Sequence, residues 1–110
     1  MRHAVIGDQT LESILQRPGV WVLVAFMYYG SVPCRFFRPE FRKLCEHFGR
    51  KLWHAEINAE ENPTITDTLK VIAVPTTLLL HNGHEEGRFE GPYSCKALIE
   101  RVDKVLKAKA

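Results

Sequence analysis

Three cysteine thiols are the side chains of this sequence best suited to covalent chemistry, because a thiolate can attack a disulfide or bind a metal ion. They are Cys34, Cys45 and Cys95, in a chain of 110 residues. An odd number of cysteines without metal-ligand spacing is not typical of a disulfide framework or a zinc site. The five histidines fall in different predicted elements: His3, His47, His54, His81 and His84. We therefore expect at least one free thiol, no bound metal and no other cofactor.

Cys45 and Cys95 have different expected surroundings. Cys45 falls on the apolar stripe of a predicted helix, where a buried cysteine acts as a small hydrophobic side chain, so we expect it to fill the core. Cys95 follows Ser94 at the start of the last predicted helix, where we expect it to be exposed. The dipole of that helix could stabilise the Cys95 thiolate, but a functional role is the less favoured interpretation.

The composition, with 45% hydrophobic and 25% charged residues, is typical of an ordinary globular protein. The length fits a single domain that covers residues 1–110. The formal net charge of +2 comes from basic and acidic residues in mixed order, which argues against binding to nucleic acid. Four basic side chains could line one helix face, and we interpret them as a solvated surface without a function: Arg35, Arg38, Arg42 and Lys43.

The longest apolar run covers residues 20–29 and is about half as long as a membrane span must be. The N-terminus lacks the basic and then apolar pattern of a signal peptide. We therefore expect a cytoplasmic protein that does not associate with membranes.

Hydrophobic patterning predicts alternating strands and helices. In residues 20–27 the odd and the even positions, which point to opposite faces of a strand, are both apolar. This is typical of a strand buried on both faces, so this strand should be central. The next helical pattern has one apolar stripe: Phe37, Phe41, Leu44, Cys45 and Phe48. The other expected elements are strands at residues 3–7, 52–57, 76–81 and 85–90, and helices after Asp8, from Asn62 as cap, and at residues 94–107. This order predicts an α/β fold, in which parallel β-α-β units and an antiparallel hairpin form a mixed sheet flanked by four helices.

Four landmarks make the sequence similar to the thioredoxin family between about residues 20 and 106. They are VLVAFMYYGSVPCR at residues 22–35, the pair Asn62-Pro63, AVPTTLLLHNG at residues 73–83, and Gly91. The resemblance implies the thioredoxin fold with a cis peptide bond before Pro75. It also implies that the backbone of Val74 lies beside the active-site turn, where family members pair with an extended substrate segment.

The resemblance places SVPC, residues 31–34, where a dithiol oxidoreductase of the family has CxxC. There the first thiol lies at a helix N-terminus, which stabilises its thiolate for attack on a disulfide, and the second thiol releases the product. Ser31 stands at the first of these catalytic positions, and a hydroxyl cannot enter the exchange. We expect Ser31 to cap the helix instead. Cys34 matches the shielded second thiol, for which a structural and a redox role are both open.

Substrate binding is implied for a set of residues around this turn: Tyr29, Gly30, Val32, Pro33, Val74, Pro75 and Gly91. Tyr28 and Tyr29 put phenol groups near the turn, where they could form part of a partner-binding patch or pack internally. Packing is the favoured interpretation.

Other positions depart from the family pattern. Ala25 stands in place of the family's buried carboxylate, so Cys34 lacks an obvious internal base. Met27 and Gly30 stand where tryptophans are usual, and Glu56 stands where a lysine is common. Because these positions change together, natural divergence is favoured over a single engineered replacement of a cysteine.

Three functions fit the sequence, so whether the protein is an enzyme stays open. In the first, which is the favoured one, the protein acts in thiol-disulfide redox chemistry through SVPC. Cys34 is then a monothiol that forms mixed disulfides with a protein or with glutathione and depends on an external thiol for release. In the second, the chain is a non-catalytic binding or chaperone-type module that holds an extended client beside Val74 and Pro75. In the third, it is a disulfide reductase, fed by thioredoxin reductase, whose nucleophile is replaced by Ser31. The expected partners are proteins that carry thiols or disulfides, and we expect a monomer.

Overall fold

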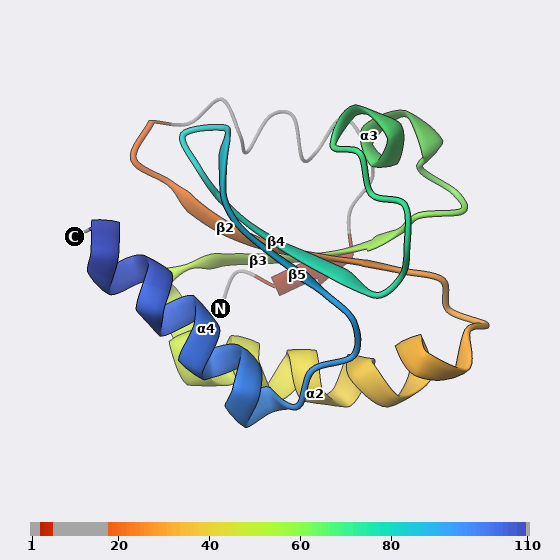
Figure 1. Ribbon diagram of the computed structural model, residues 1–110, viewed down its shortest axis with the longest axis horizontal. Coiled ribbons are helices and arrows are strands. Elements are labelled where there is room, and N and C mark those ends of the chain that lie inside the picture. Colours follow the sequence, from red (N-terminus) through yellow and green to blue (C-terminus); the bar gives the residue numbers. More distant parts are fainter. Residues whose placement is uncertain (1–2, 6–17, 110) are drawn as a thin grey trace.

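The computed structural model describes residues 3–5 and 18–109, which form a twisted sheet with helices on both faces (Figure 1). The strands are β1 (His3–Val5), β2 (Trp21–Met27), β3 (Trp53–Asn58), β4 (Thr76–His81) and β5 (His84–Glu90). The helices are α2 (Val32–Phe48), α3 (Pro63–Thr68), α4 (Cys95–Lys109) and the short 3-10 helix η1 (Gly49–Lys51). The helix predicted after Asp8 lies outside the described residues, which contain three of the four predicted α-helices.

The five strands lie in the order β1-β3-β2-β4-β5. β1 and β2 run parallel to β3, whereas β4 runs antiparallel to both β2 and β5. This is the predicted mixed sheet, and the predicted positions of the central strand and of the N-terminal edge strand are confirmed.

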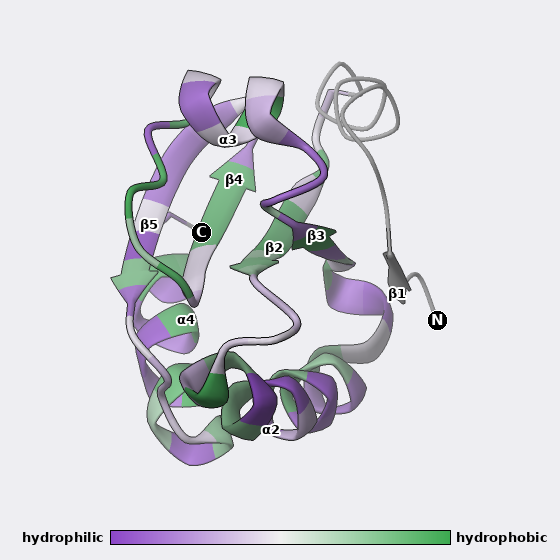
Figure 2. Cartoon of the chain, turned by 90° about the vertical axis from the view of Figure 1, so that its right-hand side faces the viewer, coloured by the Kyte–Doolittle hydropathy of each residue, from purple (hydrophilic) through white to green (hydrophobic). Residues whose placement is uncertain are grey.

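β2 is buried on both faces because its alternate side chains enter two separate clusters. Leu23 and Ala25 pack beneath α2 and α4, whereas Val24 and Phe26 pack on the side of α3. The two views agree that α2 and α4 cover one face of the sheet and α3 covers the other (Figures 1 and 2). The predicted apolar stripe of α2 is confirmed, since all five of its side chains are buried.

β4 and β5 form the predicted hairpin. Its two turn residues, Asn82 and Gly83, have φ angles of 52° and 79°. A two-residue type I′ turn requires positive φ at both positions, which asparagine and glycine tolerate. The peptide bond between Val74 and Pro75, just before β4, is cis, as the resemblance implied.

α3 begins after Asn62, but the expected side-chain cap is not made. The Asn62 Nδ2 atom instead donates a hydrogen bond of 2.9 Å to the carbonyl oxygen of Asn58. The amide group is thereby turned back to β3, and Pro63 at the first helical position has no N–H that needs an acceptor. Asn62 thus ties the start of α3 to the end of β3.

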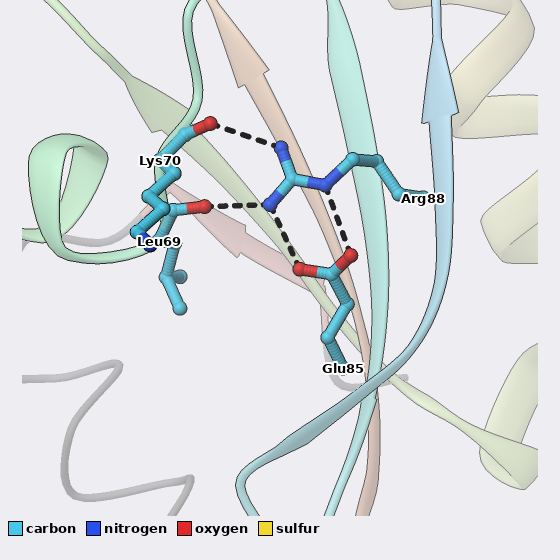
Figure 3. Close-up of polar contacts among 4 residues, drawn as sticks. All are labelled: Leu69, Lys70, Glu85 and Arg88. Carbon is cyan, nitrogen blue, oxygen red and sulfur yellow. Dashed lines mark hydrogen bonds and ion pairs between the residues drawn. The ribbon is translucent and has the colours of Figure 1, made fainter.

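Arg88 of β5 fixes the other end of α3, as Figure 3 shows. Its guanidinium donates to the carbonyl oxygens of Leu69 at 2.6 Å and Lys70 at 3.1 Å. Glu85 holds the same guanidinium through contacts of 2.8 and 2.9 Å, and this hydrogen bonding lowers the pKa of Glu85. Carbonyls at a helix end lack partners within the helix, so the guanidinium satisfies them. These contacts of Arg88 hold Leu69 and Lys70, which begin the segment that leads to Val74.

Candidate functional site

Three segments that are distant in sequence meet at the start of α2. The turn after β2 is closed by the N–H of Ser31, which donates to the Tyr28 carbonyl at 3.0 Å. Val74 packs against the same hydrophobic cluster as Cys34. The N–H of Gly91 donates to the Pro75 carbonyl at 2.9 Å, which joins the end of β5 to this segment. In Figure 2 the turn after β2 and the start of β4 both lie near the start of α2. The structure thus gathers the predicted site residues.

Ser31 occupies the N-cap position of α2 with extended backbone angles, as predicted, but its hydroxyl makes no capping hydrogen bond. The reason lies partly in the next residues. An N-cap side chain bonds the N–H of the second or third helical residue, and here the second is Pro33, which has no N–H. The amides of Val32 and Cys34 also have no acceptor among the described residues. The helix start therefore presents free donors at the site.

The Cys34 side chain is fully buried, with 0% of its surface exposed. It belongs to the cluster between the sheet and α2, and its Sγ accepts a hydrogen bond of 3.4 Å from the N–H of Tyr28. The turn therefore covers the sulfur. A disulfide in solution cannot reach Cys34 unless the turn opens.

Apolar side chains are exposed at the start of α2 and in the segment before Val74. Val32, Phe36 and Ile72 have 59, 74 and 90% of their surface exposed. A hollow of about 330 Å³ is lined by Val32, Phe36 and Arg35. A second hollow of about 240 Å³, on the side of Gly91, is lined by residues 90–93. The exposed surface around the site can therefore receive side chains of another molecule.

Glu56 places a buried carboxylate beneath α2. It pairs in register with Ala25 on the neighbouring strand, and its side chain is 0% exposed. Two arginines of α2 approach it, with Arg42 Nε 3.1 Å from Oε2 and Arg38 Nε 3.5 Å from Oε1. A buried carboxylate needs compensating charge, and α2 supplies it.

Tyr29 joins this charged cluster to the turn. The Arg38 guanidinium lies 4.3 Å from the centre of the Tyr29 ring, within the range of a cation-π contact. Burial and the charge of Glu56 raise the pKa of the Tyr29 phenol, and Arg38 partly opposes them. Tyr29 packs against the core as favoured from sequence, whereas Tyr28 is exposed.

Comparisons of the sequence and of the fold point to one family. A model of the Thioredoxin family matches residues 3–104. The chain belongs to the thioredoxin family. It is similar to thioredoxin Y1, chloroplastic, of Arabidopsis thaliana, with 32% identity over 91% of this chain and 58% of that protein. A thioredoxin of Acidithiobacillus ferridurans is 26% identical over 92% of this chain and 94% of its own. The chain therefore spans less than two thirds of the chloroplastic relative.

A solved thioredoxin structure supports the fold. The crystal structure of chloroplastic thioredoxin z matches with a TM-score of 0.83 and 19% identity, over 97% of this chain and 96% of that one. That study describes a type-specific target recognition for thioredoxin z.

In this thioredoxin a buried carboxylate lies on β3, at Glu56. The resemblance assigned the family's acid to position 25, which is alanine here. The structure places Glu56 directly across from it, on β3. Sequence reasoning noted Glu56 as a departure but missed Arg38 and Arg42 as its partners. The available signal was a glutamate inside a buried strand together with two arginines four residues apart on one face of the preceding helix.

Burial raises the thiol pKa of both other cysteines of this thioredoxin. Cys45 fills the core as predicted, and burial raises the pKa of its thiol to about 12. The expectation that Cys95 is exposed is wrong, because its side chain is half-buried. Burial and the charge of Glu40 raise its pKa, which opposes the less favoured option of a thiolate stabilised by the helix dipole. Glu40 Oε1 accepts the N–H of Cys95 at 2.8 Å, so a carboxylate occupies the start of α4.

Across residues 3–5 and 18–109, no three His, Cys, Asp or Glu side chains gather as they would around a metal ion. None of the helices in this described part is long and apolar enough to cross a membrane.

Proposed function

We propose that this thioredoxin binds extended segments of other proteins at the start of α2 without a dithiol cycle. The observation that carries the proposal is the state of Cys34, which is the only thiol of the SVPC turn and is fully buried. Position 31 carries a hydroxyl, which cannot attack a disulfide in its place. The targets are proteins of the class on which thioredoxins act, those with thiols or disulfides. The cytoplasmic location and the monomeric state stay predictions.

The backbone of Val74 supports binding of an extended segment. Its N–H and C=O form no hydrogen bond with another described residue. Val74 directly precedes the cis-proline, and β4 begins one residue after that proline. An extended segment can add to such an edge through backbone hydrogen bonds, while the hollows beside it receive alternate side chains. The predicted roles of Val74, Pro75 and Gly91 in substrate binding rest on this geometry.

A second candidate is monothiol exchange through Cys34, and one contact favours it. The Tyr28 N–H donates to Sγ, so the sulfur lies directly beneath the turn after β2. After this turn opens, the Cys34 thiolate would attack one sulfur of a client disulfide. A disulfide would form between Cys34 and the client, and the other client sulfur would leave as a thiolate. Release would then need an external thiol such as glutathione.

Site-resolved alkylation separates the two candidates. In the native protein at neutral pH, we expect iodoacetamide to modify Cys34 about 100-fold more slowly than in the denatured chain, because reaction requires local opening. Cys95, which is half-buried, should react first. Mass spectrometry of the digested protein reads each site, and the chain in guanidinium is the control. Modification of native Cys34 at the rate of the denatured chain would favour monothiol exchange.

A further inference from the structure

Three arginines of α2 line a groove next to the proposed binding site. Arg35, Arg38 and Arg42 are spaced three and four residues apart, which places them on one helix face. Together with Pro39 they line a hollow of about 400 Å³. From sequence these side chains were interpreted as a solvated surface, but a solvated surface does not require a hollow between them.

The groove carries unbalanced positive charge. Glu56 contacts Arg38 and Arg42 from below and is itself fully buried. Among the described residues, Glu56 is the one carboxylate that forms ion pairs with any of these three arginines. The Arg35 side chain is exposed and forms no ion pair or hydrogen bond with another described residue. A guanidinium of this kind is available to a carboxylate from outside.

The basic groove is continuous with an apolar hollow. Arg35 lines both, and the second hollow is completed by the exposed side chains of Val32 and Phe36. Phe36 and Arg42 are six residues apart on α2, which is about 9 Å along the helix axis. An extended chain covers that distance in about three residues. The surface therefore offers an apolar pocket and a basic groove at a defined separation.

We propose that this surface selects extended protein segments in which an apolar side chain and an acidic side chain are about three residues apart. The apolar side chain enters the hollow beside Val32 and Phe36. The acidic side chain meets Arg35 and Arg42. The inference rests on the proposed function, because the same segment also reaches the backbone edge at Val74.

The test uses fluorescent cysteine-free peptides, one with phenylalanine and glutamate three residues apart and a matched one with glutamine for glutamate. Fluorescence anisotropy with the full chain measures both affinities. At an ionic strength of about 0.02 M the glutamate peptide should bind about fivefold or more tighter than the glutamine peptide. This ratio corresponds to the free energy of one good surface ion pair. At about 0.5 M salt, screening should remove this difference.

Charge reversal within the protein identifies the groove. R35E should weaken binding of the glutamate peptide about tenfold, because it turns attraction into repulsion. R50E is the matched control, since Arg50 is exposed on η1, outside the groove. R35E should also fold normally, because the Arg35 side chain has no partner in the described part of the chain. An equal loss of affinity for the glutamate peptide in R35E and R50E would overturn the inference.

Two other outcomes separate this inference from the proposed function. If the glutamate and glutamine peptides bind equally, and methylation of the peptide backbone nitrogens abolishes both, the acidic preference is wrong and edge binding stands. If the charge dependence holds but backbone methylation changes nothing, the groove stands and pairing at Val74 is wrong. Displacement of the peptide by a single-stranded oligonucleotide at equal concentration would overturn the inference in favour of a nucleic-acid groove.

Discussion

Replacing both Arg38 and Arg42 with alanine should lower the free energy of unfolding by about 3–5 kcal/mol, the usual cost of removing the partners of a buried charge. The carboxylate of Glu56 would stay beneath α2 without either of its two arginines. Urea unfolding of the parent and the variant at neutral pH measures the difference. The cation-π contact of Arg38 with Tyr29 is lost as well, so the turn before Ser31 should also become more mobile.

The control for this prediction adds E56Q to the double variant. Glutamine keeps the shape of Glu56 but removes its charge, so most of the lost stability should return. If the double variant is destabilised by less than about 1 kcal/mol, the ion pairs are no stronger than surface pairs, and Glu56 is not a charged group held by α2.

S31C should convert the protein into a disulfide reductase. Position 31 lies at the start of α2, where the amides of Val32 and Cys34 have no acceptor among the described residues. These donors and the helix dipole would stabilise a thiolate at position 31, and Cys34 lies one turn further on. With an external dithiol as the reductant, we expect reduction of a model protein disulfide at about 100-fold or more above the parent, because Ser31 cannot attack and Cys34 is fully buried.

The matched control removes the second thiol. C34A in the S31C background should stop turnover after the mixed disulfide forms, and C34A in the parent should change nothing. Alanine at position 25 should keep the variant slower than a dithiol with a buried base, since a general base contributes about 100-fold. If S31C stays at the activity of the parent, the helix start does not activate a thiol. Residues other than Ser31 would then also prevent the dithiol reaction.

Local sequence patterns predicted most of the fold. The double-sided burial of residues 22–27, the stripe of α2 and the Asn82-Gly83 turn each depend on neighbours close in sequence, so periodicity and turn chemistry were sufficient. The resemblance added the cis peptide bond before Pro75, which no propensity shows.

The chemistry of the site was less predictable, because it depends on contacts between distant elements. The raised pKa of Cys95 follows first from its burial and then from the charge of Glu40, which is 55 residues away in the sequence. The pairing of Glu56 with α2 depends on which face of β3 it occupies, and that is fixed only by the register with β2. Ser31 lies at the N-cap position of α2, as predicted. Its predicted side-chain hydrogen bond is not made, in part because Pro33 has no N–H to donate.

The most direct test of binding without a thiol is a comparison of the parent with C34A. Two versions of the glutamate peptide are needed, one with a cysteine linked to glutathione as a mixed disulfide and one with serine in its place. We predict that, for each peptide, the parent and C34A bind with the same affinity. Mass spectrometry should find no covalent adduct. An adduct with the parent through Cys34, together with its absence in C34A, would contradict non-covalent binding and establish Cys34 as a working monothiol.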